Sequence, residues 1–338
     1  MPADFMQVLE QKKALVWPEL QRYLPKGKDM HSQLVRDYPE RGGKYLRSGL
    51  VLLAAEAFGG NPSKAIRTAA AMEASQNWIL IHDDIEDHSE DRRGKPTLSR
   101  IYGEEMAINA GDALHVIQWK MLLDNREMLD EKTAFRVLNE FYRILSLTTE
   151  GQTLELEWIQ KRGFDINEAD YYAISDAKAG MYTVIGPMRL GAIVAGAPDD
   201  QLAALNTFGL PFGRAFQIQD DVLNLTAGSA YGKEIGGDVY EGKRTLMLVH
   251  LLQNCTPAEK EKIIAIYKKK REQKKPEEVK FILDLMKSKG SIDFAKKRSL
   301  EWAAQAQRLF DSELRFLKDS PAKQTIRAGI EFVAKRPM

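Results

Sequence analysis

The chain has 338 residues, and 44% of them are hydrophobic, which is enough for a substantial core. Lysine and arginine (49) balance aspartate and glutamate (48), so the net charge of +1 gives no bulk field that would attract nucleic acid. The single cysteine, Cys255, excludes an internal disulfide and is typical of a reducing compartment. No apolar run approaches the ~18 residues of a membrane span, and residues 1–10 lack a signal-peptide core. We therefore expect a cytoplasmic protein with no transmembrane segment.

Helical patterns dominate the chain, and strand signals are scarce because no run sustains an alternation with β-branched residues. In chain order, apolar segments rich in Ala and Leu predict helices over residues 49–58, 65–82, 107–124, 132–160, 168–194, 200–225, 246–253, 257–270, 276–289 and 293–318. No Gly/Ser linker, low-complexity tract or charge block divides the chain. We predict one all-α domain over residues 1–338, with ten or more helices around a central cavity.

Turn residues separate several of these helices, at 59–62, 196–198 and 274–276. Asn61, Asp165 and Thr256 are residue types that favour helix starts, and a proline follows Asn61 and Thr256 directly. The basic run 268–275 is expected to be a solvated helix end and loop.

Two aspartate-rich segments carry the strongest chemical signal. The first contains Asp83, Asp84 and Asp87, and the second runs from Asp220 to Asn224. Because residues four apart share a helix face, Asp83 would lie beside Asp87, and Asp220 beside Asn224. Like charges at that spacing destabilise a helix by about 0.2–0.5 kcal/mol, so a cation should lie between them. Mg²⁺ prefers oxygen ligands and often takes one or two carboxylates together with substrate phosphates. Each segment is therefore a candidate magnesium site.

Cationic residues follow each aspartate-rich segment. Arg92 and Arg93 come after the first, and Lys233 and Lys243 come after the second. Two carboxylate faces opposed across a cavity, with these cations nearby, would clamp a diphosphate.

Other interpretations of the first segment are weaker. An aspartate run can be a solvated helix end without a metal. A calcium loop would need a Gly at its sharp turn and a Glu at its last position, which the segment from residue 83 lacks. His82 and His88 are six residues apart and lie on different helix faces, which disfavours a two-histidine metal site.

Four motifs, in their order and spacing, resemble those of the trans-isoprenyl diphosphate synthases, the polyprenyl synthetase family. The similarity runs from Gly42 to Lys243 and is strongest to the short-chain geranylgeranyl and farnesyl diphosphate synthases. The motifs are Gly42-Gly43-Lys44-Tyr45-Leu46-Arg47, then Asp83 to Asp87 with Arg92-Arg93-Gly94-Lys95-Pro96, then Phe216-Gln217-Ile218-Gln219-Asp220-Asp221, and finally Gly236-Gly237-Asp238 with Glu241-Gly242-Lys243-Arg244-Thr245.

The resemblance implies an all-α fold of the isoprenoid synthase type and a magnesium-dependent prenyltransferase that forms a homodimer. Its substrates would be isopentenyl diphosphate and an allylic diphosphate, with three Mg²⁺ per site stabilising the leaving group. By the same resemblance, the metal ligands are Asp83, Asp84, Asp87 and Asp220, and Lys178 joins them as a catalytic residue. The released pyrophosphate would accept the proton, which fits the lack of an obvious histidine base in the motifs.

The resemblance also assigns residues to two substrate subsites. The allylic diphosphate would be held by Arg92, Lys178, Lys233 and Lys243. Isopentenyl diphosphate would be held by Lys44, Arg47, Gln76 and Arg93, and the cavity would be lined further by Gln217, Gln152 and Tyr182. The chain departs from the family pattern in having Asn224 for the final Asp, Ala179 for a Thr and Gln76 for the commoner His.

Product length depends on the residues that close the cavity floor. The resemblance places this floor one to two turns before the first aspartate-rich segment, at Ala74, Ser75, Trp78 and Ile79. Helical spacing puts Ile79 on the face of Asp83 but Trp78 about 140° away from it. An aromatic at Trp78 without one at Ile79 resembles the geranylgeranyl type, so we predict geranylgeranyl diphosphate as the product. Gln76 resembles the farnesyl synthases, which makes farnesyl diphosphate the alternative.

Two different functions share part of this pattern. A terpene cyclase has a helical cavity and an aspartate-rich motif, but it lacks the segment from Lys44 to Arg47 and carries a different second motif. A catalytically silent subunit of a larger synthase would not need aspartates in both segments. Both readings are less favoured than the synthase.

Replacing Arg47 with alanine tests the assignment of the two subsites. Because a guanidinium binds phosphate through paired hydrogen bonds, Arg47→Ala should raise the Michaelis constant for isopentenyl diphosphate preferentially. Steady-state kinetics with each substrate varied in turn give the two constants. Equal effects on both substrates would count against the assignment.

Overall fold

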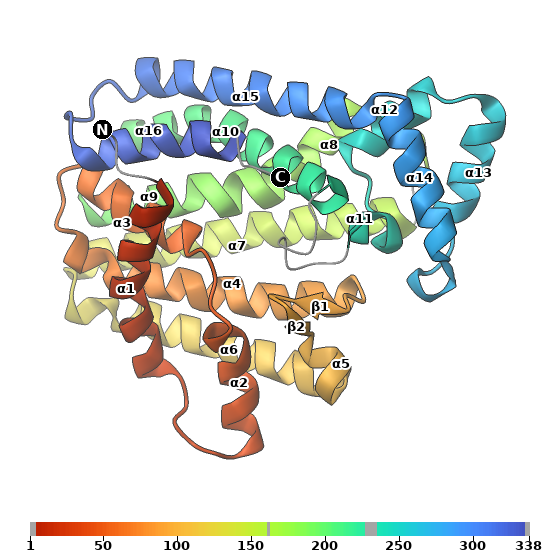
Figure 1. The fold of residues 1–338 in the computed structure, drawn as a ribbon. Helices are drawn as coiled ribbons and strands as arrows, with labels where there is room; N and C mark the ends of the chain where they lie inside the picture. The colour runs from red at the N-terminus through yellow and green to blue at the C-terminus, as the bar shows by residue number, and fades with distance from the viewer. Residues whose placement is uncertain (1–4, 161–162, 227–234, 335–338) are drawn as a thin grey trace.

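The structure, a computed structural model, describes residues 5–160, 163–226 and 235–334, so the expected substrate contact Lys233 lies outside the described residues. Within these ranges the chain is mainly helical (Figure 1). The α-helices are α1 (Phe5–Tyr23), α2 (Met30–Glu40), α3 (Leu46–Ala57), α4 (Ile66–Glu86), α5 (Leu98–Tyr102), α6 (Glu104–Asp124), α7 (Glu131–Gln160), α8 (Glu168–Ser175), α9 (Gly186–Val194), α10 (Asp199–Thr226), α11 (Gly237–Glu241), α12 (Leu246–Asn254), α13 (Pro257–Tyr267), α14 (Pro276–Ser288), α15 (Ser291–Glu313) and α16 (Pro321–Ala334).

Short elements complete the described chain. A π-helical segment, η3 (Asp176–Ile185), joins α8 to α9. The single described sheet is a two-stranded antiparallel ribbon of β1 (Asp91–Arg92) and β2 (Lys95–Pro96), which follows α4 directly. The 3₁₀ turns are η1 (Pro62–Ala65), η2 (Asn125–Glu127) and η5 (Arg271–Gln273).

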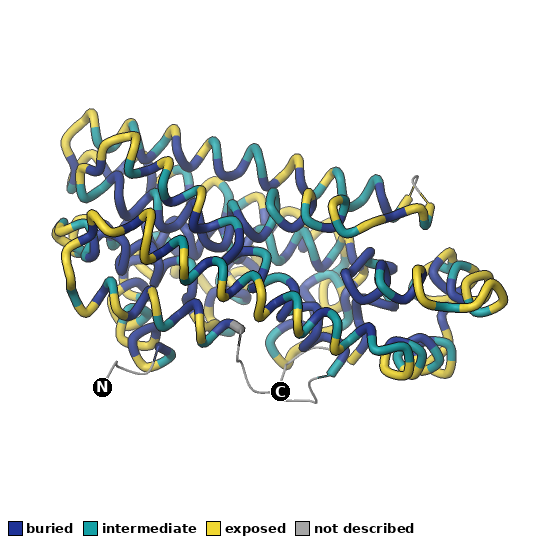
Figure 2. Tube along the Cα trace, turned by 90° about the horizontal axis from the view of Figure 1, so that it is seen from above, coloured by how far each residue is buried: buried dark blue, intermediate teal, exposed yellow. Residues whose placement is uncertain are grey.

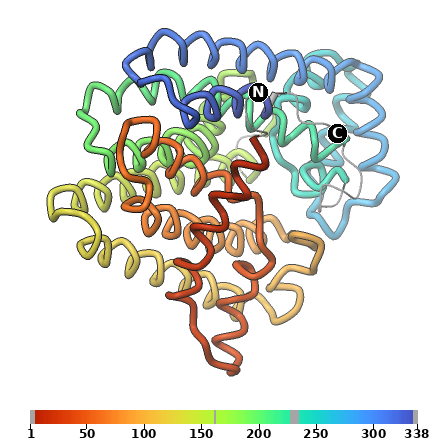
Figure 3. Tube along the Cα trace, turned by 60° about the vertical axis from the view of Figure 1, so that its left-hand side comes forward, coloured from red at the N-terminus to blue at the C-terminus, as the bar shows by residue number. Residues whose placement is uncertain are grey.

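The long helices lie in layers (Figure 1). In that view α4 and α6 form the lower part, α7 lies above them, and α10, α15 and α16 cover the top. The main packing pairs are α4 with α6, α3 with α9, and α10 with both η3 and α15. The shorter helices α12, α13 and α14 gather at the far end of the molecule (Figures 1 and 3). None of the described helices is long and apolar enough to cross a membrane.

Burial follows the apolar pattern of each helix. α4 is buried on every side over its first half, as expected for a helix at the centre of the layers. α14 instead buries one row of side chains, Val279, Ile282 and Met286, and leaves its other face in solvent. Figure 2 shows the same division along the whole tube, with buried residues facing inward and exposed ones on the outer turns.

The expected all-α fold is confirmed, and each of the ten predicted helical segments is helical in the structure. The bounds differ at some ends: α4 continues past His82 to Glu86, and α15 stops at Glu313 rather than at residue 318. Five helices were not expected, namely α1, α2, α5, α11 and α16. Two of them carry readable start signals, because Asp29 caps α2 and Ser320 precedes Pro321 at the start of α16.

The expected helix starts are right in two cases and wrong in one. Asn61 accepts a hydrogen bond from the Ser63 amide at 3.0 Å and begins η1. Thr256 forms a reciprocal capping box with Glu259 at the start of α13. Asp165 does not cap a helix. Asn167 begins α8 instead, because its side chain accepts from the following amides and Asp170 bonds back to the Asn167 amide.

Close contact between α3 and α9 depends on Gly191. A Cβ at this position would lie 2.1 Å from the carbonyl oxygen of Val51 and 2.9 Å from Ala54 Cβ. Real Cβ atoms do not approach backbone so closely, so the two helices can pack at this distance only with glycine here.

Gly191→Ala should therefore lower the free energy of unfolding by about 1–3 kcal/mol, the usual cost of overpacking a core. Urea unfolding followed by circular dichroism measures the change. Gly180→Ala is the matched control, because a Cβ there would meet Leu210 Cδ2 at 3.6 Å and the Ser175 carbonyl oxygen at 3.8 Å, both ordinary contact distances, and it should be neutral or slightly stabilising. Equal destabilisation by the two variants would show that the space at Gly191 is not limiting.

Candidate active site

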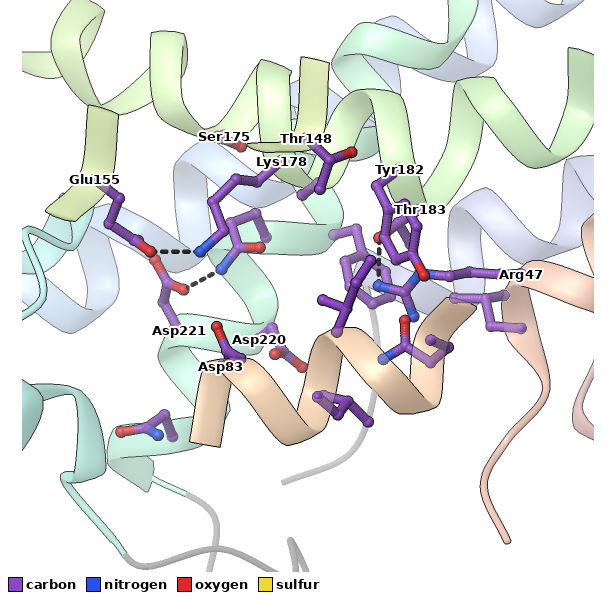
Figure 4. A pocket seen from close by; sticks show the side chains of 18 of the residues that line it. Arg47, Asp83, Thr148, Glu155, Ser175, Lys178, Tyr182, Thr183, Asp220 and Asp221 are labelled. Atoms are coloured by element: carbon purple, nitrogen blue, oxygen red, sulfur yellow. Dashed lines mark hydrogen bonds and ion pairs between the residues drawn. The ribbon is translucent and has the colours of Figure 1, made fainter. Parts of the chain in front are cut away.

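A cavity of about 510 Å³ lies between α3, α4, α7, η3 and α10, and the segment from Asp238 to Thr245 contributes to its wall. Figure 4 shows Asp83 on α4 and the pair Asp220 and Asp221 on α10 directed toward the same space. The two aspartate-rich segments therefore line one cavity from different helices, as their sequence pattern predicts. Its apolar lining includes Leu46, Ile79, Leu80, Ile174, Ala179 and Phe216.

The π-helical segment brings Lys178 to this cavity. Lys178 forms an ion pair with Glu155 of α7, and both side chains line the cavity (Figure 4). Burial lowers the pKa of Lys178, but Glu155, Asp83 and Asp87 raise it by more, so the net shift is upward and the ammonium stays charged. Sequence reasoning expected an ordinary helix over 168–194. Within it, the wider turns of η3 are a feature that often accompanies functional sites.

The first aspartate-rich segment divides into carboxylates with different surroundings. Asp83 faces the cavity, whereas Asp84 is only 1% exposed and accepts hydrogen bonds from Tyr38 Oη at 2.6 Å and Arg92 Nε at 2.9 Å. Arg92 itself lines the cavity, and the Asp84 carboxylate raises its pKa against the effect of burial. The structure thus brings the expected metal ligand Asp84 and the expected diphosphate contact Arg92 together as an ion pair.

Asp87 is buried and paired with Lys243, whose Nζ lies 2.6 Å from its Oδ2 and 2.8 Å from Glu241 Oε2. Burial raises the pKa of Asp87 to about 8, and the nearby carboxylates Asp83 and Glu241 add to the rise, while Lys243 opposes it. The ion pair with Lys243 favours the charged form of Asp87. The positive charge of Lys243 thus offsets part of the repulsion between the neighbouring carboxylates. A divalent cation would relieve the same crowding.

On the opposite wall, Asp221 accepts hydrogen bonds from Gln217 Nε2 at 2.6 Å and Tyr171 Oη at 2.9 Å. Burial raises the pKa of Asp221 to about 7; these two hydrogen bonds lower it, and Asp220 and Glu155 raise it further. Asp220, the expected metal ligand, lines the cavity beside it. Gln217 therefore has a place both in the lining and in the support of the second aspartate-rich segment.

The site offers hard oxygen ligands of the kind that Mg²⁺ binds. Among the described residues, however, no three His, Cys, Asp or Glu side chains converge closely enough to hold an ion by themselves. This fits a metal that takes one or two carboxylates and completes its shell with water and substrate phosphates. Asp83 near the end of α4 and Asp220 on α10 line the cavity, whereas Asp87, the residue after α4, is buried beside it.

The other end of the cavity is rich in cations. It is lined by the four expected contacts of isopentenyl diphosphate, Lys44, Arg47, Gln76 and Arg93. Arg47 donates to Thr183 Oγ1 at 2.7 Å and its guanidinium lies 4.8 Å from the centre of the Tyr182 ring (Figure 4). Arg93 is held by hydrogen bonds to the carbonyl oxygen of Tyr38 at 2.8 Å and to Asn77 Oδ1 at 3.0 Å.

Two lining carboxylates were not singled out from the sequence. Glu155 pairs with Lys178, and Glu73 lies at the cation-rich end. Neither has another acidic residue three or four positions away in its helix, so neither shows a helical spacing signal. Their burial depends on tertiary packing.

The basic run 268–275 is not wholly solvated, which corrects the expectation. Lys274 is only 6% exposed, and its Nζ donates to the carbonyl oxygens of Val239 at 2.8 Å and Tyr240 at 2.6 Å. Burial, with Arg244 and Arg271 nearby, lowers the pKa of Lys274 to about 8. Because these carbonyls belong to the last turn of α11, Lys274 supports the segment that carries Lys243 into the cavity.

Of the four residues expected at the cavity floor, Ile79 lines the cavity. Trp78 lies toward α6, where its Nε1 donates to Gln118 Oε1 at 2.7 Å and its ring centre is 4.6 Å from that of His115. Ser75 accepts a hydrogen bond from Tyr182 Oη at 3.1 Å, and Ala74 is fully buried. The placement of Trp78 and Ile79 follows helical spacing.

Comparison with known proteins identifies the family. A profile of the polyprenyl synthetase family matches residues 28–286. A short chain isoprenyl diphosphate synthase of Methanothermobacter thermautotrophicus is 33% identical over 298 residues, which cover 87% of each chain. A geranylgeranyl diphosphate synthase of Sulfolobus acidocaldarius is 34% identical over 256 residues, covering 75% of this chain and 76% of that one.

Comparison with solved structures points to the same family. The geranylgeranyl pyrophosphate synthetase of Pyrococcus horikoshii superimposes with a TM-score of 0.85 at 31% identity, over 98% of both chains. The chain therefore belongs to the polyprenyl synthetase family, as its motifs indicate. It is a prenyltransferase of the short-chain isoprenyl diphosphate synthase type, which confirms the enzyme class expected from the sequence.

Ile79→Phe should shift the products toward shorter chains by about tenfold in ratio. Overpacking an apolar space costs roughly 1–3 kcal/mol, and about 1.4 kcal/mol changes a rate ratio tenfold. Chromatography of the dephosphorylated products measures the distribution. Trp78→Ala is the companion variant and should lengthen the products if Trp78 supports the floor. A folded, active Ile79→Phe enzyme with unchanged products would remove Ile79 from the floor.

Proposed function

We propose that residues 1–338 form one domain that condenses isopentenyl diphosphate with allylic diphosphates in a magnesium-dependent reaction and releases geranylgeranyl diphosphate. The main support for this proposal is one cavity into which Asp83 and Asp220 point from different helices. The same cavity is lined by lysines, arginines and apolar side chains. The relatives named geranylgeranyl diphosphate synthase, from Sulfolobus acidocaldarius and Saccharolobus solfataricus, support this product. Farnesyl diphosphate is the alternative that Gln76 favours.

Metal binding falls to the two aspartate-rich segments. Asp83, Asp84 and Asp87 would bind two Mg²⁺ from α4, and Asp220 would bind a third from α10. Bound Mg²⁺ would neutralise the charge that develops on the departing diphosphate. Asp84 would first have to exchange its contacts with Arg92 and Tyr38, so Asp83 and Asp87 are the better-placed ligands on this wall.

The cations divide between the two diphosphates. Lys178, Lys243 and Arg92 line the aspartate end and would hold the allylic diphosphate while its carbon–oxygen bond breaks. Lys44, Arg47, Gln76 and Arg93 would orient isopentenyl diphosphate so that its double bond faces the allylic carbon.

After the carbon–oxygen bond breaks, the allylic cation must be protected from water. Leu46, Ile79, Leu80, Ile174 and Phe216 would keep water from the allylic cation. The new carbon–carbon bond forms as the double bond attacks, and the proton then leaves for the released pyrophosphate. This assignment gives no protein side chain the role of base.

A homodimer is part of the proposal, and exposed apolar residues on α6 and α7 support it. On α6 these are Ile108, Val116 and Leu123, and on α7 they are Phe135 and Tyr142. Val116 is 69% exposed and Tyr142 is 66% exposed, and the two helices contact one another. A patch of this kind on adjacent helices is typical of a subunit interface. A cytoplasmic location, suggested by the single cysteine, stays a prediction.

Asp83→Ala and Asp220→Ala should each reduce turnover at least about 10²–10³-fold, because charge stabilisation is usually the largest catalytic contribution. Turnover of isopentenyl and allylic diphosphates by the purified chain is the measurement, with and without Mg²⁺. Asp284→Ala is the control, since this aspartate is 63% exposed on α14 and forms a surface ion pair with Lys280. Full activity in excess EDTA, or in either active-site variant, would contradict the proposal.

A further inference from the structure

Glu73 is an acidic side chain in the lining of the cation-rich end of the cavity. It lies on α4, ten residues before Asp83, which is about 15 Å along the helix. Only 4% of it is exposed, and the mechanism above gives it no task. A fixed negative charge among phosphate-binding cations would weaken the binding of an anion.

The hydrogen bonds around Glu73 fit either protonation state. Ser48 Oγ lies 2.8 Å from Glu73 Oε1 and 3.2 Å from the carbonyl oxygen of Tyr45. A hydroxyl has one proton, so it can donate to only one of these acceptors at a time. When Glu73 is ionised, Ser48 donates to it. When Glu73 is protonated, Glu73 donates to Ser48 and Ser48 donates to Tyr45, so no hydrogen bond is lost.

Charged groups face Glu73 from several elements. Arg47 comes from the first turn of α3 and Arg93 from the turn after β1, and Lys44, just before α3, lines the same cavity. Burial raises the pKa of Glu73, while the hydrogen bond from Ser48 and the charges of Arg93 and Arg47 lower it, and the rise prevails. The pKa of this carboxyl group in the free protein is therefore higher than that of an exposed glutamate.

The two tyrosines near Glu73 stay protonated in the physiological range. Tyr45, over whose ring Lys13 of α1 lies at 5.8 Å, and Tyr182 of η3 both have pKa values that burial raises above that of free tyrosine. On α6, which also packs against α4, Asp112 pairs with His82 at 3.6 Å, about two and a half turns further along α4 from Glu73. Glu73 is therefore the group at this end whose charge can change.

We propose that Glu73 takes up a proton when a diphosphate binds among Lys44, Arg47 and Arg93. The inference rests on the proposed function, which assigns this subsite to isopentenyl diphosphate. A fully ionised diphosphate monoester carries three negative charges, and three cations balance them only when Glu73 is neutral. The proton comes from the solvent and no covalent bond in the ligand changes. Glu73 is in this sense a positioning residue, which sets the net charge of the subsite.

The sign of the pH dependence follows. A bound diphosphate adds negative charge beside Glu73 and raises the pKa of Glu73 above its value in the free protein. Binding is therefore strongest below the pKa of the free protein and weakens as the pH rises through the pKa of the complex. A glutamine, which is neutral at every pH, should lack this dependence.

Isothermal titration calorimetry with isopentenyl diphosphate alone tests the inference. EDTA removes metal from the aspartate walls, and the absence of an allylic partner prevents turnover. Titrations in buffers of different ionisation enthalpy give the number of protons taken up. Wild type should take up between about 0.3 and 1 proton more than Glu73→Gln. From pH 6 to pH 9, the wild-type Kd should rise about tenfold more than that of the variant, since one pKa unit corresponds to a factor of ten.

The comparison between the two proteins cancels the ionisation of the ligand itself. Ser48→Ala is the second variant; it keeps the carboxyl group, so it should still take up the proton. Equal proton uptake by wild type and a folded Glu73→Gln, or a loss of affinity in Glu73→Gln that is the same at every pH, would overturn the inference. Absence of turnover by wild type with both substrates and Mg²⁺ would instead count against the proposed function.

Discussion

Crowded negative charge in a buried cavity is the constraint on which the site depends. Carboxylates from α4, α7 and α10 lie in one space, and burial raises the pKa values of Asp87 and Asp221. An unpaired charge in such surroundings would cost several kcal/mol. Each of these buried carboxylates has a partner that stabilises its charge. Lys243 pairs with Asp87, Arg92 pairs with Asp84, and Tyr171 and Gln217 donate hydrogen bonds to Asp221.

The walls of the cavity are tied to each other by packing that leaves little freedom. A Cβ on Gly213 of α10 would lie 2.4 Å from Gly180 Cα, so α10 and η3 touch backbone to backbone. Arg214 adds two hydrogen bonds of 2.6 Å to Asp176, and Tyr182 bonds across to Ser75 on α4. The distance between the aspartate walls is therefore set by glycine contacts and a few polar pairs.

Much of the fold and the centre of the site could be predicted from the sequence, because apolar and acidic residues recur there at helical spacing. The four-residue spacing within each aspartate-rich segment placed Asp83 and Asp220 correctly in the lining, and helical spacing separated Ile79 from Trp78. Glu155 could not be found in this way, because no acidic residue lies three or four positions from it in α7. The π turns of η3 depend on how residues 168–194 pack against α7 and α10.

Hydrogen bonds and ion pairs between residues far apart in the sequence could not be predicted either. The contact of Asp84 with Tyr38 joins positions 46 apart in sequence, and nothing local announces it. Two of the unexpected helices, in contrast, have sequence signals that predict a helix start: Asp29 before α2 and Ser320-Pro321 at the start of α16. The lesson is that composition and spacing find elements and repeated ligands, whereas single buried charges appear only once the helices are assembled.

The ion pairs of Lys178 with Glu155 and of Lys243 with Asp87 have a consequence for which anions the cavity can admit. Each lysine already has a counterion that is part of the same chain and held at hydrogen-bond distance. A free phosphate in solution must compete with a tethered carboxylate, whose effective concentration far exceeds its own. A phosphate group that arrives with a divalent cation faces no such competition, because the cation engages the carboxylate while the phosphate engages the lysine. Under the proposed function, the two pairs would therefore favour metal-bound diphosphates over simpler anions.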